Sequence, residues 1–241
     1  MRYMVKLCQG GSKSMDIRKY AVIQSKILGH RKKRVELFFQ TFKPSEQTSI
    51  LDIGGTIDFW EFYATYPRRL NITILNLRYP TIEGKVYRNN YQFIQANALS
   101  LPFRNKSFDI VFSNSLIDHL YSFENQEKFA SEVDRVSNNY FIQTGNKNFP
   151  YEPHYLTPFI NYLSKNMQKK IVRNFTFWGL LARPTSEQVN SIVDEIILST
   201  KSEFKSLFPD ALIMEQKILA MVKSFIAIKN IDKFSTFHNY Q

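Results

Sequence analysis

The feature that most restricts the fold is an alternation, from residue 49 onward, of short apolar runs with stretches of helical periodicity. Continuously apolar runs of this length, bounded by turn signals, are the pattern of strands buried on both faces. Helical stretches over 57–66 and 124–136 lie between the runs. Strands that alternate with helices predict a parallel sheet covered by helices on both faces. The predicted parallel strands are 49–53, 71–77, 91–96, 107–113 and 140–144.

The ends of the chain complete this prediction. Residues 14–42 place apolar side chains at mostly helical spacing, with a break at Gly29-His30 and an end before Pro44. The stretch between 145 and 209 holds helical segments and no good strand, and 211–216 with 222–228 form a hairpin about five residues apart. We expect an α/β fold, a Rossmann-like doubly wound sheet of seven strands. It would be mostly parallel with a C-terminal antiparallel hairpin, plus N-terminal helices and a helical insertion.

The formal net charge of +11 is concentrated near the N-terminus. Residues 1–48 hold 11 Lys and Arg against 3 Asp and Glu, whereas residues 49–241 hold 21 against 18. Such a basic segment can be a solvated outer face, attract an anionic small molecule, touch an acidic membrane surface or bind nucleic-acid phosphates. The solvated face is the interpretation we place first.

Cysteine content and hydropathy restrict the compartment. Cys8 is the only cysteine, which excludes a disulfide framework, a cysteine-only zinc or iron-sulfur site and a CxxC redox motif. Apolar runs fall far short of the roughly 20 residues that span a bilayer. The first residues lack the sustained apolar region of a secretory signal. We expect a cytoplasmic protein without a transmembrane segment.

Unusual residues follow several of the predicted strands. Gly54 and Gly55 come directly after the first strand, where missing side chains let backbone approach a ligand closely. Ligands of open parallel sheets bind outside the carboxyl ends of the strands. The two glycines are adjacent and are followed by Thr56, so they do not match the GxGxxG spacing of a nicotinamide site.

Three motifs resemble, in their order and spacing, those of the class I S-adenosylmethionine-dependent methyltransferases, and more narrowly the type 11 small-molecule group. The motifs are Ile-Leu-Asp-Ile-Gly-Gly-Thr at 50–56, Ala-Asn-Ala-Leu-Ser-Leu-Pro-Phe at 96–103 and Ser-Phe-Asp-Ile-Val-Phe-Ser-Asn-Ser-Leu-Ile-Asp-His at 107–119. The resemblance covers about residues 49–146, and the final hairpin fits the family's last two strands. It implies S-adenosylmethionine as cofactor and S-adenosylhomocysteine as product. By this resemblance Asp52, Gly54 and Gly55 line the methionine end of the cofactor.

The resemblance also implies four further cofactor residues. Asn76 stands where the family usually has an acidic residue on the ribose, and Asn97 where an aspartate commonly meets the adenine. Ala98 would offer its N–H to the base, and Ser113 its carbonyl to the methionine amine. Neutral amides thus stand in place of both carboxylates. A hydrogen bond to a neutral acceptor is weaker than one to a charged acceptor by roughly 1 kcal/mol, so the two replacements together would weaken cofactor binding about 30-fold. Alternatively, the two asparagines are turn residues.

Catalysis of methyl transfer can come largely from proximity and alignment. If the acceptor is a hydroxyl, a base helps, and a histidine with a pKa near neutrality is suited to that task. His119, a few residues after the fourth strand, is the first candidate, and His154, after the fifth strand and beside Glu152 and Tyr155, is the second. Each could equally be a packed structural histidine. No His, Asp or Glu group has metal-ligand spacing, so we predict no metal.

The leading hypothesis is a small-molecule methyltransferase, with O-methylation as the expected reaction. An RNA methyltransferase is the alternative suggested by the isoelectric point of about 9.6 and by the basic run 31–34, and a non-catalytic interaction protein on the same scaffold is a third. Peripheral membrane contact stays open. We expect one structural domain of four segments: a basic helical segment 1–48, a cofactor-binding core 49–146, a helical lid 147–208 that selects the acceptor, and a closing hairpin with tail 209–241.

Overall fold

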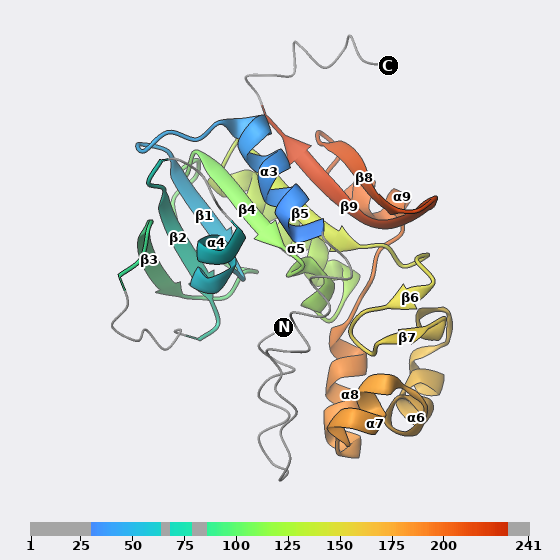
Figure 1. Ribbon diagram of the computed structural model, residues 1–241. Coiled ribbons are helices and arrows are strands. Elements are labelled where there is room, and N and C mark those ends of the chain that lie inside the picture. Colours follow the sequence, from blue (N-terminus) through green and yellow to red (C-terminus); the bar gives the residue numbers. More distant parts are fainter. Residues whose placement is uncertain (1–29, 64–67, 79–85, 231–241) are drawn as a thin grey trace.

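Seven strands form one sheet in the order β3-β2-β1-β4-β5-β9-β8 (Figure 1). The computed structural model describes residues 30–63, 68–78 and 86–230, so the predicted helical stretch over 14–29 lies outside the described residues. The first five strands are parallel, and β9 runs antiparallel to both β5 and β8. This is the predicted Rossmann-like sheet with its closing hairpin. The strands are β1 (Ser49–Ile53), β2 (Asn71–Asn76), β3 (Asn90–Gln95), β4 (Ile110–Asn114), β5 (Tyr140–Gly145), β8 (Leu212–Ile218) and β9 (Met221–Lys229).

The strand order reverses beside β1, which fixes where a ligand can bind. Strand β1 pairs with β2 on one side and with β4 on the other, and its Asp52 lies opposite Ile74 and Phe112. Open parallel sheets bind ligands outside the carboxyl ends of the strands at such a reversal. The residues at the carboxyl ends of the parallel strands, those after β1 and β4 above all, are therefore the ones that can reach a bound ligand.

Helix α3 (His30–Phe42) covers one face of the sheet and belongs to its core (Figure 1). Its Phe38 is fully buried and meets three rings edge to face, with centroids 5.2 to 5.8 Å apart. These rings belong to Trp60 of α4 (Ile57–Tyr63), Phe112 of β4 and Phe141 of β5. Edge-to-face packing adds to the stabilisation from burial. The helix ends at Phe42, before Pro44, as the sequence predicts.

The opposite face is covered by α5 (Phe123–Val136) and α9 (Lys201–Leu207), so helices lie on both faces as predicted. Buried Phe129, Val133 and Phe204 pack there against the sheet. Ser122 caps α5 by accepting from the N–H of Asn125. No helix in the described part of the chain is long and apolar enough to cross a membrane.

The insertion between β5 and β8 forms a small cluster beyond the carboxyl end of the sheet (Figure 1). It contains α6 (Lys165–Phe175), α7 (Phe177–Ala182), α8 (Ser186–Glu195) and a short 3-10 turn, Ile160–Tyr162. Its own apolar core includes Tyr155, Val172 and Trp178. The expectation that this stretch holds no strand is wrong, because β6 (Tyr151–Glu152) pairs with β7 (Thr157–Pro158). Two residues per strand are too few to show an alternating pattern in the sequence.

Two boundaries also differ from the prediction. Strand β4 begins at Ile110 rather than residue 107, because Asp109 turns back to accept from the N–H and hydroxyl of Ser49 at 2.8 and 2.7 Å. The closing hairpin is longer and tighter than predicted, with two residues between β8 and β9 instead of about five. Polar side chains such as Lys217 belong to these strands. A prediction based on runs of apolar residues therefore ends the strands before such side chains.

Phe38→Ala tests whether α3 is part of the core. The substitution leaves a cavity among three buried rings, and we expect it to lower the free energy of unfolding by about 3–5 kcal/mol in urea denaturation. The control Phe62→Ala removes a ring that is 70% exposed and should change stability by less than about 0.5 kcal/mol. Equal effects of the two substitutions would contradict a core role for α3.

Candidate active site

The turn after β1 is organised around a buried carboxylate. The Oδ2 atom of Asp52 accepts a 2.6 Å hydrogen bond from the Trp60 indole, whereas its buried Oδ1 has no hydrogen-bond partner among the described residues. Gly54 has a φ of +79°, a conformation that side chains resist, and donates to the Leu75 carbonyl at 2.8 Å. A Cβ on Gly55 would lie 1.6 Å from the Asp52 carboxylate. Bare backbone and an unsatisfied carboxylate oxygen thus meet at the carboxyl end of β1.

The two predicted asparagines both serve the turns in which they stand. The Oδ1 atom of Asn76 accepts from the N–H of Leu77 at 2.9 Å, and its Nδ2 donates to the Gly55 carbonyl at 3.3 Å. An ionised carboxylate could not make the second bond, since it only accepts. Asn97 is exposed, and its Oδ1 accepts from the N–H of Leu99 at 3.0 Å. These bonds support the turn interpretation and leave the ligand roles as predictions.

The remaining two cofactor candidates are buried near the strand reversal. Ser113 is fully buried on β4, and its hydroxyl donates to the Ile53 carbonyl of β1 at 2.9 Å. That bond joins the carboxyl ends of β1 and β4. Ala98 follows β3 and is 8% exposed within the apolar core of the α5 face. Their backbone groups, which the resemblance assigns to the cofactor, stay predicted contacts.

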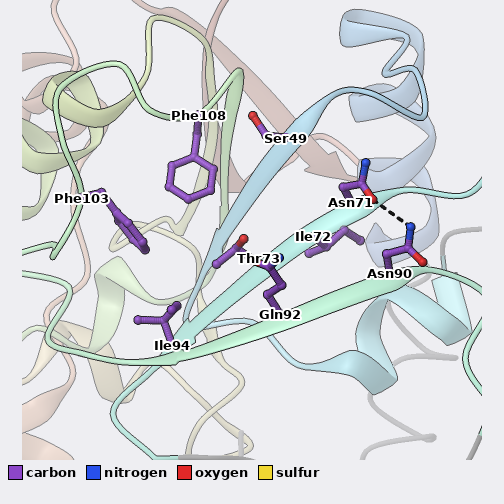
Figure 2. A pocket seen from close by; sticks show the side chains of 9 residues that line it. All are labelled: Ser49, Asn71, Ile72, Thr73, Asn90, Gln92, Ile94, Phe103 and Phe108. Carbon is purple, nitrogen blue, oxygen red and sulfur yellow. Dashed lines mark hydrogen bonds between the residues drawn. The ribbon is translucent and has the colours of Figure 1, made fainter.

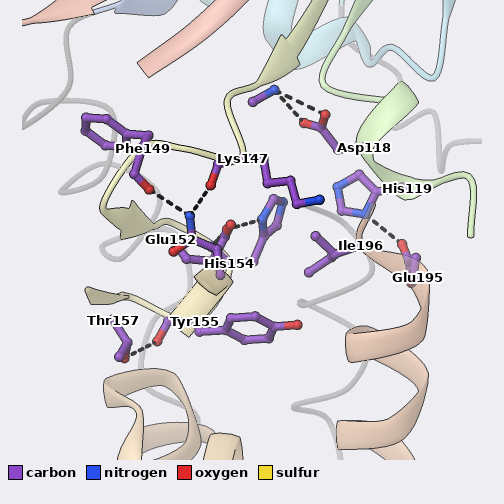
Figure 3. Close-up of polar contacts among 12 residues, drawn as sticks. Asp118, His119, Lys147, Phe149, Glu152, His154, Tyr155, Thr157, Glu195 and Ile196 are labelled. Carbon is purple, nitrogen blue, oxygen red and sulfur yellow. Dashed lines mark hydrogen bonds and ion pairs between the residues drawn. The ribbon is translucent and has the colours of Figure 1, made fainter. Parts of the chain in front are cut away.

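The two histidines singled out in the sequence lie against each other. The rings of His119 and His154 meet edge to face with centroids 5.0 Å apart (Figure 3). Each has a buried acidic neighbour: Nδ1 of His154 lies 2.5 Å from Oε1 of Glu152, and Nδ1 of His119 lies 2.8 Å from Oε1 of Glu195. The Glu195 carboxylate opposes the effect of burial on the His119 ring. Two segments 35 residues apart in the chain are thus brought to one site.

Asp118 positions this pair. Its buried carboxylate accepts from the N–H of Gly145 at 3.1 and 3.2 Å and from the Thr144 hydroxyl, which ties the turn after β4 to the end of β5 (Figure 3). Its carbonyl accepts from the N–H of Ile197 at 2.8 Å, which ties the same turn to the residues after α8. His119 directly follows Asp118, so these bonds fix the position of the His119 backbone from which its ring extends.

The surroundings move the two histidine pKa values in opposite directions. Burial lowers the pKa of His119 below its usual value, against the opposing effect of Glu195. Burial also acts to lower the pKa of His154, but the charge of Glu152 and the hydrogen bond to it outweigh burial and raise that pKa. His119 therefore loses its proton at a lower pH than His154, and between the two pKa values His119 is neutral while His154 is charged. A neutral imidazole beside an imidazolium provides a base and an acid.

A buried arginine lies at the carboxyl ends of β4 and β5. Arg34 of α3 is 5% exposed, and its Nη1 donates to the side-chain oxygens of Asn114 and Gln143. Burial, and then the charge of Arg31, lowers the pKa of Arg34 to about 9, so it stays charged at neutral pH. Burial, followed by Arg34 and Arg31, also lowers the pKa of Lys223 on β9 to about 8. Positive charge therefore gathers at this edge of the sheet, held by neutral amides.

A hollow of about 270 Å³ lies elsewhere, toward the amino ends of the first three strands (Figure 2). Asn90 donates from Nδ2 to Oδ1 of Asn71 at 2.9 Å along its rim. No residue predicted for the site lines it, and the carboxyl ends of the strands lie at the opposite edge of the sheet. The candidate site is therefore the carboxyl edge, not this hollow. The lining residues are Ser49, Asn71, Ile72, Thr73, Asn90, Gln92, Ile94, Phe103 and Phe108.

Sequence reasoning missed several residues that build the carboxyl edge. Asp118 stands beside a predicted histidine, and its neighbourhood to His119 is the one signal that could have drawn attention to it. Glu195 lies 76 residues after its partner His119, and Arg34 lies 109 residues before Gln143. Separations of this size carry no spacing pattern, so only the fold brings these residues together.

Comparisons with known proteins point to one family. Residues 52–139 match the family model of a methyltransferase domain, a stretch that holds all the predicted cofactor residues and His119. The comparison with curated proteins gave no match.

Solved structures share the fold at low sequence identity. A possible exported protein from Bordetella parapertussis is 11% identical, with a TM-score of 0.53 over 95% of this chain and 78% of that one. The 1,6-didemethyltoxoflavin-N1-methyltransferase from Burkholderia thailandensis, with 1,6-didemethyltoxoflavin and S-adenosylhomocysteine bound, is 10% identical, with a TM-score of 0.50 over 91% of this chain and 92% of that one. A small RNA methyltransferase is 15% identical, with a TM-score of 0.50 over 82% and 24%. At these identities the likeness establishes the fold alone.

Asp52→Asn tests the buried carboxylate. Burial, despite the hydrogen bond from Trp60, raises the pKa of Asp52 to about 7, so between about pH 4 and 7 the native state keeps a proton that the unfolded state releases. Native stability should therefore fall across this window as the pH rises, by up to about 4 kcal/mol. The neutral Asn side chain has no proton to release, so the variant lacks this loss of stability. Its free energy of unfolding should therefore rise relative to that of the wild type as the pH increases from about 4 to 7. Parallel pH curves for the two proteins would contradict the raised pKa.

Proposed function

We propose that this chain, a class I S-adenosylmethionine-dependent methyltransferase, methylates a hydroxyl group of a small molecule. The observation that carries the proposal is the histidine pair with its two buried carboxylates, which lies beyond the carboxyl ends of β4 and β5. In an open parallel sheet this edge is the place for bound ligands. The bound cofactor supplies an activated methyl group, and the protein has to orient the acceptor and take up its proton.

The residues after β1 fit the cofactor. Asp52 keeps one buried oxygen free for a donor, and Gly54 and Gly55 present backbone without side chains beside it. We assign Asp52, Gly54, Gly55, Ala98 and Ser113 to cofactor binding. The assignment extends to Asn76 and Asn97 at the ends of the next two strands.

His119 is the residue that we propose as the base. Its pKa is lowered, so its ring is neutral at physiological pH. The Glu195 carboxylate beside Nδ1 favours a proton on that nitrogen, which leaves the lone pair on Nε2. Nε2 would accept the hydroxyl proton as the acceptor oxygen is methylated. His154, whose pKa is raised by Glu152, would keep its proton to a higher pH than His119 and, when protonated, offer positive charge to the forming alkoxide.

The arrangement of the basic run 31–34 favours a small acceptor over RNA. Arg34 points inward and is buried, and Lys32 lies 3.9 Å from Glu36 one helical turn away. Lys32 and Lys33 are exposed, so the run displays only part of its charge outward to phosphates. One structural neighbour is named as a 1,6-didemethyltoxoflavin N1-methyltransferase and another as a small RNA methyltransferase, so our preference for a small acceptor is supported by the inward position of Arg34 alone.

Calorimetry with S-adenosylmethionine and S-adenosylhomocysteine tests the cofactor assignment. We expect Asn97→Asp to tighten binding about fivefold, since a charged acceptor adds roughly 1 kcal/mol and the new carboxylate can still accept from Leu99. The matched variant Asn76→Asp should give no such gain, because it loses the bond to the Gly55 carbonyl. Absence of binding at millimolar cofactor would refute the proposed function and leave the scaffold interpretation.

Histidine titrations by NMR test the base assignment without knowledge of the acceptor. One imidazole should titrate below the usual value near 6.5 and be lost in His119→Gln, and another should titrate above it and be lost in His154→Gln. Glu195→Gln should lower the His119 pKa further, and Glu152→Gln should lower the pKa of His154. If neither glutamate variant moves its partner's titration, the pair is not tuned as proposed.

Turnover separates the base from a packed histidine. With a hydroxyl acceptor found by screening with labelled cofactor, His119→Gln should reduce kcat about 10²- to 10⁴-fold at unchanged cofactor affinity. A loss of cofactor binding of the same size would show a structural histidine instead.

A further inference from the structure

The insertion exposes large apolar side chains that its own core does not use. On α6, Met167, Ile171 and Phe175 follow one another at intervals of four residues and so lie along one side of the helix. Met167 is 47% and Phe175 is 75% exposed, whereas Val172 is fully buried in the core of the insertion. Met167 and Phe175 are therefore turned away from the packed interior, whereas Ile171 between them packs against that core.

Helix α7 repeats the same division. Trp178 is buried in the core of the insertion, but Phe177 and Leu180 are 58% and 59% exposed and Leu181 is 44% exposed. Residues at 177, 180 and 181 share one side of a helix. The preceding 3-10 turn adds an exposed pair of stacked rings, Phe159 and Tyr162. We call these side chains the insertion surface: Phe159, Tyr162, Met167, Phe175, Phe177, Leu180 and Leu181.

Cations predominate in the segment that carries this surface. Residues 153–186 contain five Lys and Arg and no Asp or Glu. Lys165 donates to the carbonyls of Val193 and Ile196, and Lys169 pairs with Asp194 of α8. The other three, Lys170, Arg173 and Arg183, are exposed, and among the described residues they have no acidic partner.

Exposed apolar and aromatic side chains interleaved with cations match the chemistry of an anionic bilayer. The apolar side chains enter the boundary between headgroups and acyl chains, and each cation near the surface strengthens binding to acidic lipids. An RNA would be bound through cations and stacked rings and would gain little from Met167, Leu180 or Leu181. We propose that the insertion surface docks this enzyme onto a membrane that contains anionic phospholipids.

The position of the surface gives docking a consequence for the site. Helix α6 packs against both α7 and α8, and α8 ends at Glu195, the residue beside His119. His154 lies in the same insertion, between β6 and β7. The helices that would contact the bilayer therefore belong to the same insertion as His154 and Glu195, and α6 packs against the helix that ends at Glu195, so docking would hold the histidine site near the membrane.

Sedimentation of the full chain with lipid vesicles tests the proposal. We expect it to pellet with phosphatidylcholine vesicles that contain about 30% phosphatidylglycerol, and far less with phosphatidylcholine alone. Binding should weaken as salt rises from about 0.1 M to 0.5 M, because the electrostatic part is screened. No pelleting with the anionic vesicles would overturn the proposal.

Two double variants locate the contact. Phe175→Ser with Leu180→Ser should reduce vesicle binding at least about tenfold, and Lys170→Gln with Arg173→Gln should reduce it severalfold for anionic vesicles only. The matched control, Phe62→Ser with Leu219→Ser, removes side chains 70% and 90% exposed outside this surface and should bind as the wild type does. Circular dichroism melting checks that each variant is folded.

Three outcomes would contradict the assignment. The control could lose binding as much as the insertion variants, which would place the contact elsewhere. The chain could be a dimer that Phe175→Ser with Leu180→Ser dissociates, with no vesicle binding, which would make the surface a contact between copies. It could also shift RNA in a gel through Lys170 and Arg173 while ignoring vesicles. None of these outcomes depends on methyl transfer, so the docking proposal stands or falls separately from the proposed function.

Discussion

The carboxyl edge of the sheet depends on one buried carboxylate. Asp118 binds the end of β5 through Gly145 and Thr144 and holds the residues after α8 through its carbonyl bond to Ile197. Gln126 reinforces this junction by donating to the carbonyls of Ile117 and Ile197 at 3.0 and 2.8 Å. Buried polar groups are costly unless they are satisfied, so these bonds strongly favour one arrangement of the three segments. The histidine pair inherits its geometry from that arrangement.

The described part of the basic N-terminal segment contributes to the core and to the ligand edge, and not only to a solvated face. Within the described residues its helix α3 is part of the core through Phe38, and one of its cations, Arg34, is turned inward onto the amides of Asn114 and Gln143. The expectation of a wholly solvated basic face is therefore wrong for Arg34. Its charge instead adds to that of Lys223 at the ligand edge, where an anionic group of a bound ligand would be favoured.

The sheet was predictable because apolar runs and glycines report local structure. The strands, the closing hairpin and the place of Gly54 and Gly55 followed from patterns a few residues long, and so did the alternative that Asn76 and Asn97 are turn residues, which their bonds to Leu77 and Leu99 support. Partners far apart in the chain did not: Glu195 reaches His119 only after the insertion has folded. The short strands β6 and β7 were missed because two residues show no period. What a sequence pattern cannot supply is the pairing of side chains across segments.

The most direct test of the central claim, a cofactor site at the carboxyl edge beside the histidine pair, is a crystal structure with S-adenosylhomocysteine. We expect the ligand over Gly54 and Gly55, a donor on the free oxygen of Asp52, and the sulfur on the side of the site that His119 faces. Ligand bound in the hollow near Asn71 and Asn90, or a carboxyl edge filled by the protein's own side chains, would contradict it.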